Sequence, residues 1–557
     1  MSRVRHIIFW GPGYASGWRA LAIMGFLVGV LAAGCGQGGV GNGGGRDDGI
    51  WVDTSGDRHV LFVTTEPLYE ATLEYAAYRE TLGYAVTVLT TQQVLDEAGP
   101  ESLLTLAEAL QSRTTAWASA ILEGASRPET VQLYLMILGD AKDTTPEDPL
   151  FVPVVEGQGG FVGDVAYGDL DGDGAPEVAV GRLPVREAEE VRAYLERVQV
   201  YERQRTPGPW NKRVSAFAGA GGFGPELDGL MEWAALLVFE SLSYDVDITM
   251  TYAASTSPYY LPRGAWDADY VQRYKDGSLL QPYIGHTSDW HDPGALSEPI
   301  RRGLVTYLSC GDGDFQSSWS PVSSLADEML LTPAGPMVSL AASDWSHPYG
   351  NAVLALELSV ALINDRAPSY GLALTWAKQR MLYPEGEVRG MLDTSSEAFL
   401  DEPANHLVRT HAVMYNLLGD PALDPGFPPG QVTFDGADSA LLGERFTVTG
   451  TVSTDAAGRL MRDGEVTLTL EVERGEIPGD LIPVDGEPTL EQALANHATA
   501  NEKVVVRATG PVQDGRFSVQ LNIPATGLAT GPYLLKGFAL SDTTDAMGSV
   551  EFVLRRY

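Results

Sequence analysis

Short apolar runs alternate with segments of helical composition over most of this chain. Apolar runs that are not broken by polar residues are typical of strands buried on both faces, and their alternation with helices predicts a mostly parallel sheet with helices on both faces. We therefore expect an α/β fold from about residue 51 to residue 425. The first strands expected are His59–Thr64, Tyr84–Leu89, Leu133–Leu138, Arg213–Ala218 and Val246–Tyr252, with helices near 69–82, 101–123, 187–203 and 226–242.

One strand–helix–strand unit lies between residues 279 and 315. A strand is expected at Gln281–Gly285, a helix at Pro293–Arg302 and a second strand at Leu304–Leu308, and Gly303 stands where a helix C-cap glycine would. Such a unit makes its two strands parallel neighbours. Later elements expected are a helix at Ser324–Leu331, a strand at Pro336–Ala342 and helices at Asn351–Asn364 and Gly371–Arg380.

The two strands of this unit end at residues with reactive side chains. His286 follows the first strand and Cys310 follows the second. Since the carboxyl ends of neighbouring parallel strands open into one crevice, we expect the two side chains to face each other there. An imidazole beside a thiol is the minimum apparatus for catalysis by a thiolate nucleophile.

Simpler interpretations of these two residues exist. A lone cysteine after an apolar strand is more often a small buried hydrophobic residue than a nucleophile. A lone histidine is usually structural, and other histidines compete for the role, namely His291, His347, His406 and His411. The position of both residues at the ends of neighbouring strands favours the catalytic interpretation.

The pattern of apolar and polar residues changes after Pro425. Runs with a period of two residues, such as Glu465–Val472 and Arg516–Asn522, are separated by Gly and Asp turns. This pattern predicts an immunoglobulin-like β-sandwich with a helical insert near Leu490–Thr499. The domain organisation expected is a signal peptide at 1–34, a tether at 35–50, an N-terminal α/β subdomain at 51–208, a second α/β subdomain at 209–425 that contains His286 and Cys310, and the sandwich at 426–557.

The N-terminal residues have the features of an export signal. Arg3, Arg5 and Arg19 precede the apolar run 20–33, which is short for a membrane span. Small residues before Cys35 resemble a bacterial lipobox, in which that cysteine is lipidated, although a disulfide with Cys310 is also conceivable. The Gly-rich stretch 36–45 would be a flexible tether. We expect a lipid-anchored protein of the bacterial cell envelope, and Gly36 in place of Asp favours the outer membrane.

Charge excludes one class of partner. The 557 residues carry a formal net charge of −37, which argues against nucleic acid because a phosphate backbone would be repelled. The 44% of apolar residues and 20% of charged residues are ordinary for a globular protein, so the chain has material for large cores.

A short acidic loop predicts a structural calcium ion. Asp169, Asp171 and Asp173 stand at alternate positions, followed by a glycine and by Glu177 at the ninth place. This spacing curls carboxylates around a hard cation. Val180 stands where an EF-hand needs its bidentate acid, so a full EF-hand is excluded, and a plain Asp/Gly turn is the alternative.

Taken together, the motifs resemble the gingipain-type cysteine peptidases, which have a caspase-like catalytic domain. The resemblance covers about residues 58–424. The motifs that carry it are Gly139-Asp140-Ala141, LDGDGAPEVAVGRLPV at 170–185, the GH block at Gly285–Pro293, SCGDGDF at Ser309–Phe315 and, more weakly, NLLGDPAL at 416–423.

The resemblance implies the roles of several residues. His286 and Cys310 would be the catalytic pair of a cysteine endopeptidase, and the backbone N–H groups of Cys310 and Thr287 would hold the oxyanion. Family members commonly have glycine where Thr287 stands. Asp164 and Trp345 would line a substrate pocket for a basic P1 side chain. The resemblance assigns no acidic residue to orient the histidine, and Glu156 is the one candidate for this role.

Three functional classes remain open. The first is a cell-surface endopeptidase that hydrolyses protein or peptide substrates. The second is a gingipain-like transpeptidase that acts in protein export. The third is a calcium-dependent surface binding protein on an inactive peptidase scaffold. The sequence gives no oligomeric state.

Overall fold

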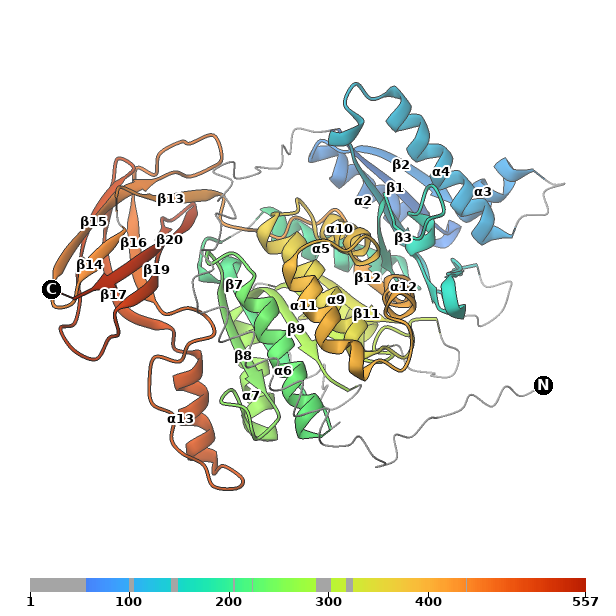
Figure 1. Ribbon diagram of the computed structural model, residues 1–557. Helices are drawn as coiled ribbons and strands as arrows, with labels where there is room; N and C mark the ends of the chain where they lie inside the picture. The colour runs from blue at the N-terminus through green and yellow to red at the C-terminus, as the bar shows by residue number, and fades with distance from the viewer. Residues whose placement is uncertain are drawn as a thin grey trace.

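A computed structural model describes residues 57–99, 105–141, 149–203, 206–222, 224–286, 302–316, 324–436 and 438–556. The α/β part is built on one sheet of ten strands in the order β2-β1-β3-β6-β12-β11-β10-β9-β7-β8 (Figure 1). The pairs in this sheet are parallel except for β11 with β12, which is antiparallel. The predicted mostly parallel α/β fold is therefore confirmed.

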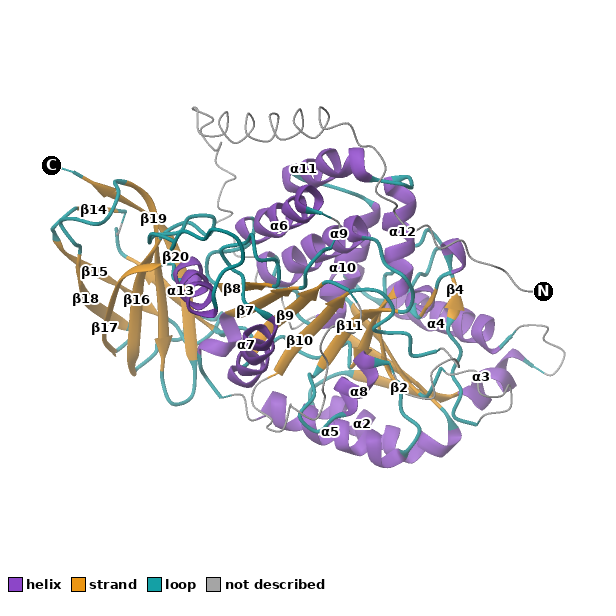
Figure 2. Cartoon of the chain, turned by 90° about the horizontal axis from the view of Figure 1, so that it is seen from below, coloured by secondary structure: helices purple, strands orange, loops and turns teal. Residues whose placement is uncertain are grey.

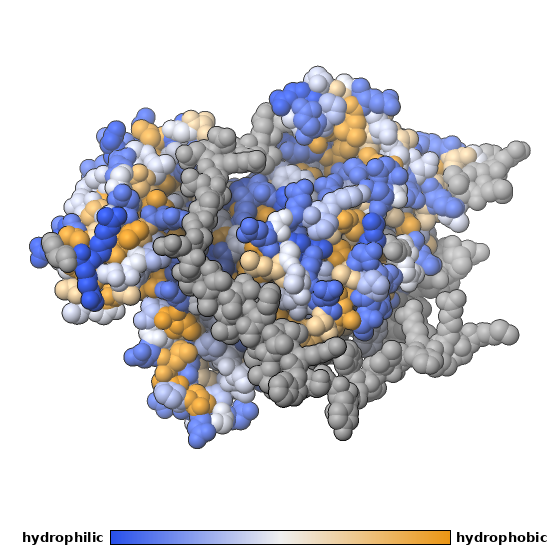
Figure 3. Space-filling model, in the orientation of Figure 1, coloured by the Kyte–Doolittle hydropathy of each residue, from blue (hydrophilic) through white to orange (hydrophobic). Residues whose placement is uncertain are grey.

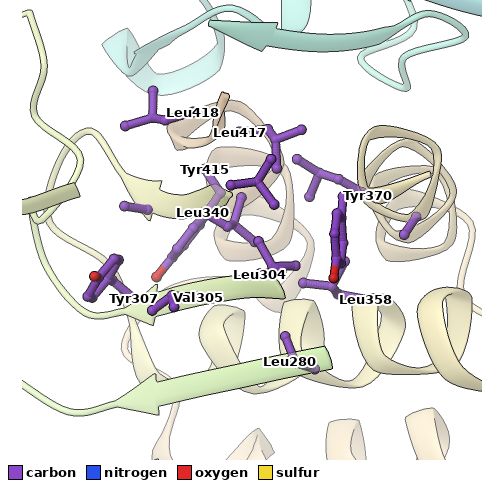
Figure 4. Close-up of a cluster of buried hydrophobic side chains, with 14 of the residues drawn as sticks. Leu280, Leu304, Val305, Tyr307, Leu340, Leu358, Tyr370, Tyr415, Leu417 and Leu418 are labelled. Carbon is purple, nitrogen blue, oxygen red and sulfur yellow. The ribbon is translucent and has the colours of Figure 1, made fainter. Parts of the chain in front are cut away.

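The strands of this sheet are β1 Arg58–Thr64, β2 Ala85–Thr90, β3 Gln132–Leu138, β6 Ala179–Leu183, β7 Arg213–Ala218, β8 Asp247–Tyr252, β9 Ser278–Ile284, β10 Arg302–Leu308, β11 Val338–Ala342 and β12 Tyr415–Gly419. Strands β6 and β12 join the strands of the two expected α/β halves into one sheet. The halves also contribute to a common apolar core. Figure 4 shows part of this core, where Leu304, Leu340 and Leu417 come from three neighbouring strands.

Helices cover both faces of the sheet (Figure 2). On one side lie α6 Pro225–Glu240, α9 Pro348–Ser359, α10 Tyr370–Leu382, α11 Glu387–Ser396 and α12 Ala404–Met414; on the other lie α2 Tyr69–Thr81, α5 Ala188–Arg203, α7 Arg263–Asp276 and α8 Leu325–Leu331. Helices α3 Thr91–Ala98 and α4 Leu106–Gly124 lie near the edge strand β2, and a hairpin of β4 Val155–Glu156 and β5 Val162–Gly163 precedes β6.

Strands β9 and β10 form the parallel pair that the sequence predicts. Their register places Leu308 opposite Ile284. The helix expected at 293–302 lies outside the described residues. The interpretation of Gly303 as a helix C-cap is wrong, because Gly303 belongs to β10. A Cβ at this position would lie 2.2 Å from the carbonyl oxygen of Leu279, so close packing between the strands explains the glycine.

The C-terminal domain corrects the expected immunoglobulin-like sandwich. Its strands are β13 Gly430–Phe434, β14 Ser439–Leu441, β15 Arg445–Val452, β16 Asp463–Glu471, β17 Val504–Gln513, β18 Arg516–Asn522, β19 Gly531–Leu540 and β20 Asp545–Arg555. Pairing of β13 with β20 closes seven of them into a barrel, and β14 pairs with β20 alongside. Closure removes the free edges that two separate sheets would leave.

The barrel is bound to the α/β part by polar contacts. The guanidinium of Arg474 donates to the carbonyl oxygens of Phe239, Leu242, Ser243 and Val246 at 2.5–3.1 Å. The helix α13 Leu490–Asn501 extends from the barrel beside β8 and carries exposed leucines on its outer face (Figures 1 and 3). These contacts make the barrel part of the same body as the sheet.

The predicted signal peptide, tether and lipidation site Cys35 lie outside the described residues. Within the described ranges, none of the helices has both the length and the apolar character that crossing a membrane requires.

Candidate active site

His286 and Cys310 lie at the same end of two paired strands. Each follows its strand by two residues, His286 after Ile284 of β9 and Cys310 after Leu308 of β10, and those two strand residues are partners in the register. Both side chains line a cavity of about 80 Å³, which we call the thiol pocket. The predicted convergence of an imidazole and a thiol at this edge of the sheet is therefore present in the structure.

The thiol of Cys310 contacts the loop between β11 and α9. The backbone N–H of Ser346 donates to Sγ at 3.4 Å, and the Ser346 carbonyl oxygen lies 3.5 Å from Sγ. The thiol can therefore both accept from and donate to the backbone of Ser346. The backbone N–H of Gly311 in turn donates to the carbonyl oxygen of Asp344 at 3.0 Å. The loop and the cysteine turn thus fix each other.

Two buried side chains hold this loop. Asn351, the fourth residue of α9, donates from Nδ2 to Oγ of Ser346 at 3.0 Å and to the carbonyl oxygen of Leu308 at 3.3 Å. The hydroxyl of Tyr415 donates to Oδ1 of Asn351 at 2.7 Å. Asn351 is 5% exposed and Tyr415 is fully buried. This chain of hydrogen bonds leads from the core to the thiol through Ser346.

The histidines that compete with His286 have structural partners. Nε2 of His411 accepts from the backbone N–H of His347 at 2.8 Å, and burial lowers the pKa of His411 to about 4, so its ring is neutral. His347 caps α9 by accepting from the N–H of Tyr349. His406 pairs with Glu402 four residues away. His291 lies outside the described residues.

A backbone carbonyl orients His286. Nε2 of His286 lies 2.7 Å from the carbonyl oxygen of Gly221, in the loop after β7. A carbonyl only accepts, so Nε2 carries the proton. The hydroxyl of Tyr283 donates to the carbonyl oxygen of His286 at 2.8 Å and fixes its backbone. The suggested orienting acid Glu156 lies instead in the β4–β5 hairpin with its side chain exposed.

A buried carboxyl group lies in the turn that carries the thiol. Asp312 is 3% exposed and accepts a hydrogen bond from the hydroxyl of the fully buried Ser309. Burial raises the pKa of Asp312 to about 6, which the bond from Ser309 partly offsets. The cysteine turn therefore contains a group that titrates near neutral pH.

Asp164 does not offer an open acidic pocket, which corrects the role expected for it. Its carboxylate accepts two hydrogen bonds from Arg182, at 2.6 and 2.7 Å, and the residue is 4% exposed. The buried ammonium of Lys378 also faces this charge, and burial lowers the pKa of Lys378 to about 7. Because Arg182 pairs with both of its oxygens, the Asp164 carboxylate is compensated within the core.

Trp345 lies in the loop that contacts the thiol. It is adjacent to Ser346 and 78% of its surface is exposed. The indole of Trp345 is therefore open to contact with another molecule, and its role in a substrate pocket stays a prediction. The backbone of Thr287 lies outside the described residues, so that part of the predicted oxyanion site is not described.

The acidic loop brings three of its four expected ligands together. One carboxylate oxygen each from Asp169, Asp171 and Glu177 lie within 4.8 Å of one another. Asp173 points elsewhere, since it accepts from the hydroxyl of Tyr383 and from the N–H of Ala175. Three converging carboxylates fit a hard cation such as calcium.

Sequence reasoning missed Gly221, Ser346 and Asn351. Ser346 follows the strand next to β10, so its place at the carboxyl edge of the sheet was a usable signal. Gly221 and Asn351 act through bonds that span 65 and 43 residues of sequence, and no local pattern marks them.

The chain is similar to one protein family and to several solved structures. The model of peptidase family C25 matches residues 53–426. Structural neighbours include a complex of the pro- and mature domains of RgpB from Porphyromonas gingivalis (15% identity, TM-score 0.47, 89% of this chain and 100% of that one) and the Arg-specific cysteine proteinase gingipain R (16%, 0.47, 90% and 99%). A structure described as a protease has 13% identity, a TM-score of 0.50, and coverage of 90% and 98%. No curated protein matches.

Proposed function

The chain belongs to peptidase family C25, the gingipain family, and on this basis we propose that it is a cysteine endopeptidase with Cys310 as nucleophile and His286 as proton carrier. The observation that carries the proposal is the shared pocket at the ends of β9 and β10, which both side chains line. A nucleophile and a base within one pocket are the arrangement that thiolate catalysis requires.

The chemistry follows from the two groups. Cys310 passes its proton to the imidazole, and the thiolate forms a bond to the peptide carbonyl carbon while the carbonyl electrons move to oxygen. Collapse of this tetrahedral intermediate breaks the C–N bond, and the imidazolium of His286 gives its proton to the leaving amine. Water then attacks the thioester carbon while the imidazole takes a proton from it. Collapse of this second tetrahedral intermediate breaks the C–S bond, the acid product leaves, and the imidazolium returns its proton to the sulfur of Cys310.

The hydrogen bond to Gly221 assigns the nitrogens of the imidazole. Because Nε2 donates to the carbonyl oxygen of Gly221, Nδ1 is the nitrogen that exchanges the proton with Cys310. The hydrogen bond from Ser346 supports the thiolate. The backbone N–H of Cys310, with that of Thr287, would stabilise the oxyanion.

A calcium ion in the acidic loop is part of the proposal, in a structural role. Asp169, Asp171 and Glu177 would hold it, and the loop leads directly into β6. We expect calcium to raise the melting temperature of the protein and a chelator to lower it. Replacement of Asp171 by Asn would remove this response, while Asp435→Asn, on the barrel, would keep it.

The location of the protein is proposed from its sequence. The signal-like segment 1–34, Cys35 and the glycine-rich tether support a lipid-anchored envelope protein, in which the catalytic domain faces soluble protein substrates. Metabolic labelling with a fatty-acid analogue tests this directly. Incorporation into the wild type, with loss in Cys35→Ala, is the expected result.

The catalytic proposal is tested with thiol labelling and a peptide library. We expect iodoacetamide to label Cys310 and the purified protein to cleave peptides internally, with both activities lost in Cys310→Ala. His286→Ala should lower kcat by at least about 100-fold, whereas the matched surface variant His406→Ala should leave it unchanged. An added amine acceptor separates hydrolysis from transpeptidation by its products. Peptide cleavage that survives in Cys310→Ala would reject the assignment.

A further inference from the structure

A second cavity lies behind the thiol pocket, between the sheet and the helices on one face. It has a volume of about 190 Å³ and is lined by side chains of the strands β9 and β10 and of the helices α6, α9 and α11, which lie above the sheet in Figure 2. Its walls are almost entirely apolar; Leu230, Val238, Leu280, Leu358 and Leu392 are examples. Leu280 and Leu358 are also drawn in Figure 4. We call this space the apolar cavity.

The apolar cavity adjoins the thiol pocket. Five residues line both spaces, namely Met231, Ala235, Ile284, Leu308 and Pro348. Ile284 and Leu308 are the last residues of the strands that lead to His286 and Cys310. Met231 is unbranched, so its side chain can move aside at small cost. The path from the thiol pocket into the apolar cavity is therefore short and lined by apolar side chains.

A polar atom inside the cavity has no partner. Thr306 lies on β10 two residues before Leu308 and also lines the apolar cavity. It is 1% exposed, and its hydroxyl makes no hydrogen bond within the described parts of the chain. A buried hydroxyl without a partner is unfavourable. The hydroxyl on the cavity wall can therefore form a hydrogen bond with a group that enters the cavity.

We propose that the apolar cavity receives a large apolar side chain of the substrate, from the residue whose carbonyl carbon Cys310 attacks. The proposal rests on the peptidase function and names the substrate class for it, which is peptides with Leu, Met, Phe or Tyr before the scissile bond. Apolar walls favour such side chains by excluding water. Asp164, the acid expected to receive a basic side chain, is paired with Arg182 instead.

The test compares peptides that differ only at the residue before the scissile bond. With the purified full chain, we expect kcat/KM for Leu and Phe to exceed that for Ala and Arg by about tenfold or more. Ala355→Phe places a ring in the cavity from α9 and should abolish this preference. The rate of Cys310 alkylation by iodoacetamide in the same variant reports whether the thiol pocket is intact.

Controls separate a filled cavity from a damaged fold. Ala77→Phe makes the same substitution at an exposed position of α2 and should change nothing. Ala352→Leu, a smaller filling of the same cavity, should reduce the preference in part and covers the case in which Ala355→Phe does not fold. An equal loss for all substrates in Ala352→Leu, or an Arg preference in the wild type, would overturn the proposal.

A ligand-binding measurement distinguishes failure of this proposal from failure of the peptidase function. Toluene should raise the melting temperature of Cys310→Ala. The rise should be smaller when Ala352→Leu is added and absent when Ala355→Phe is added. If the wild type cleaves no peptide but toluene binds in this way, the cavity takes apolar groups and the peptidase function is wrong. If peptides are cleaved without apolar preference, the assignment of the cavity to substrate is wrong.

Discussion

The backbone N–H of Ser346 donates a hydrogen bond to Sγ of Cys310 at 3.4 Å. The two residues come from loops after neighbouring strands, β11 and β10. Ser346 is held from the other side by Asn351 on α9. The thiol is therefore positioned by three elements, namely β10, the loop after β11 and helix α9. A substitution at Asn351 on α9 should therefore alter the position of the sulfur through Ser346.

Asn351→Ala tests this positioning. The substitution removes both hydrogen bonds that Asn351 donates and leaves the hydroxyl of the fully buried Tyr415 without its acceptor. We expect a loss of about 1–3 kcal/mol in the free energy of unfolding and a fall in kcat of roughly tenfold, with a smaller change in KM. Urea unfolding and peptide kinetics measure the two effects.

Asn364→Ala is the matched control. Asn364 also bonds backbone through both ends of its amide, to Ser241 and Ser243, but it follows α9 away from the thiol. It should cost stability without a specific loss of kcat. Equal kinetic losses in both variants would show that Asn351 acts only through general stability.

Gly221→Ala tests the partner of His286. A Cβ on Gly221 would lie 2.2 Å from a carboxylate oxygen of Asp228, so either that side chain or the Gly221 carbonyl must move. We expect kcat/KM to fall about tenfold because the imidazole loses its fixed orientation. Gly229→Ala, in the same helix as Asp228 and with open space around it, should retain activity. Full activity in Gly221→Ala would remove the carbonyl from the mechanism.

The positions of His286 and Cys310 at one edge of the sheet could be predicted from the sequence, because they depend on local patterns of apolar residues. Apolar runs identify β9 and β10, and a parallel pair necessarily brings the residues after its two strands to one edge. The pattern alone therefore predicts that His286 and Cys310 lie at the same edge of the sheet. Helix α7 was missed, although Trp266, Tyr270 and Tyr274 repeat every four residues and are all buried, because the polar residues between them obscure the apolar face.

Other features depend on contacts that no local pattern encodes. Asp164 stands at a motif position that implies a substrate pocket, but its carboxylate forms an ion pair with Arg182 of β6. The barrel closes through Gln431 of β13 and Met547 of β20, which are far apart in sequence. Alternating strands predict a sheet with one buried face, and they do not specify whether its ends meet.

Asp312 predicts a pH dependence of stability. Its pKa of about 6 in the folded protein lies above about 3.9 for an unfolded chain. The folded state keeps the proton between these values, so the stabilisation is fully present below about pH 4 and is lost as the pH rises to about 6. The total is about 3 kcal/mol.

Asp312→Asn should remove this dependence, because a neutral amide can still accept from Ser309. Relative to the wild type, the variant should gain about 2–3 kcal/mol between pH 4 and pH 7.5. Urea unfolding of both proteins at the two pH values measures the difference. If the difference in the free energy of unfolding between the two proteins did not change with pH, Asp312 would be ionised over the whole pH range.

Arg474 links the barrel to the catalytic half. It donates to carbonyl oxygens at and just after the C-terminal end of α6, where a cation also complements the helix dipole. Arg474→Met keeps the length of the side chain but removes the donors to these oxygens, at a cost of about 1–3 kcal/mol in the free energy of unfolding. Since α6 carries Met231 and Ala235 of the thiol pocket, kcat/KM should fall as well.

Arg516→Met, at an exposed position of β18, makes the same substitution away from this contact and should be neutral in both measurements. Thermal unfolding and peptide kinetics of the two variants decide the question. If Arg474→Met lost stability but kept full activity, the barrel would support the fold without influencing the pocket. Loss of both would show that α6 transmits the state of the barrel to the site at Cys310.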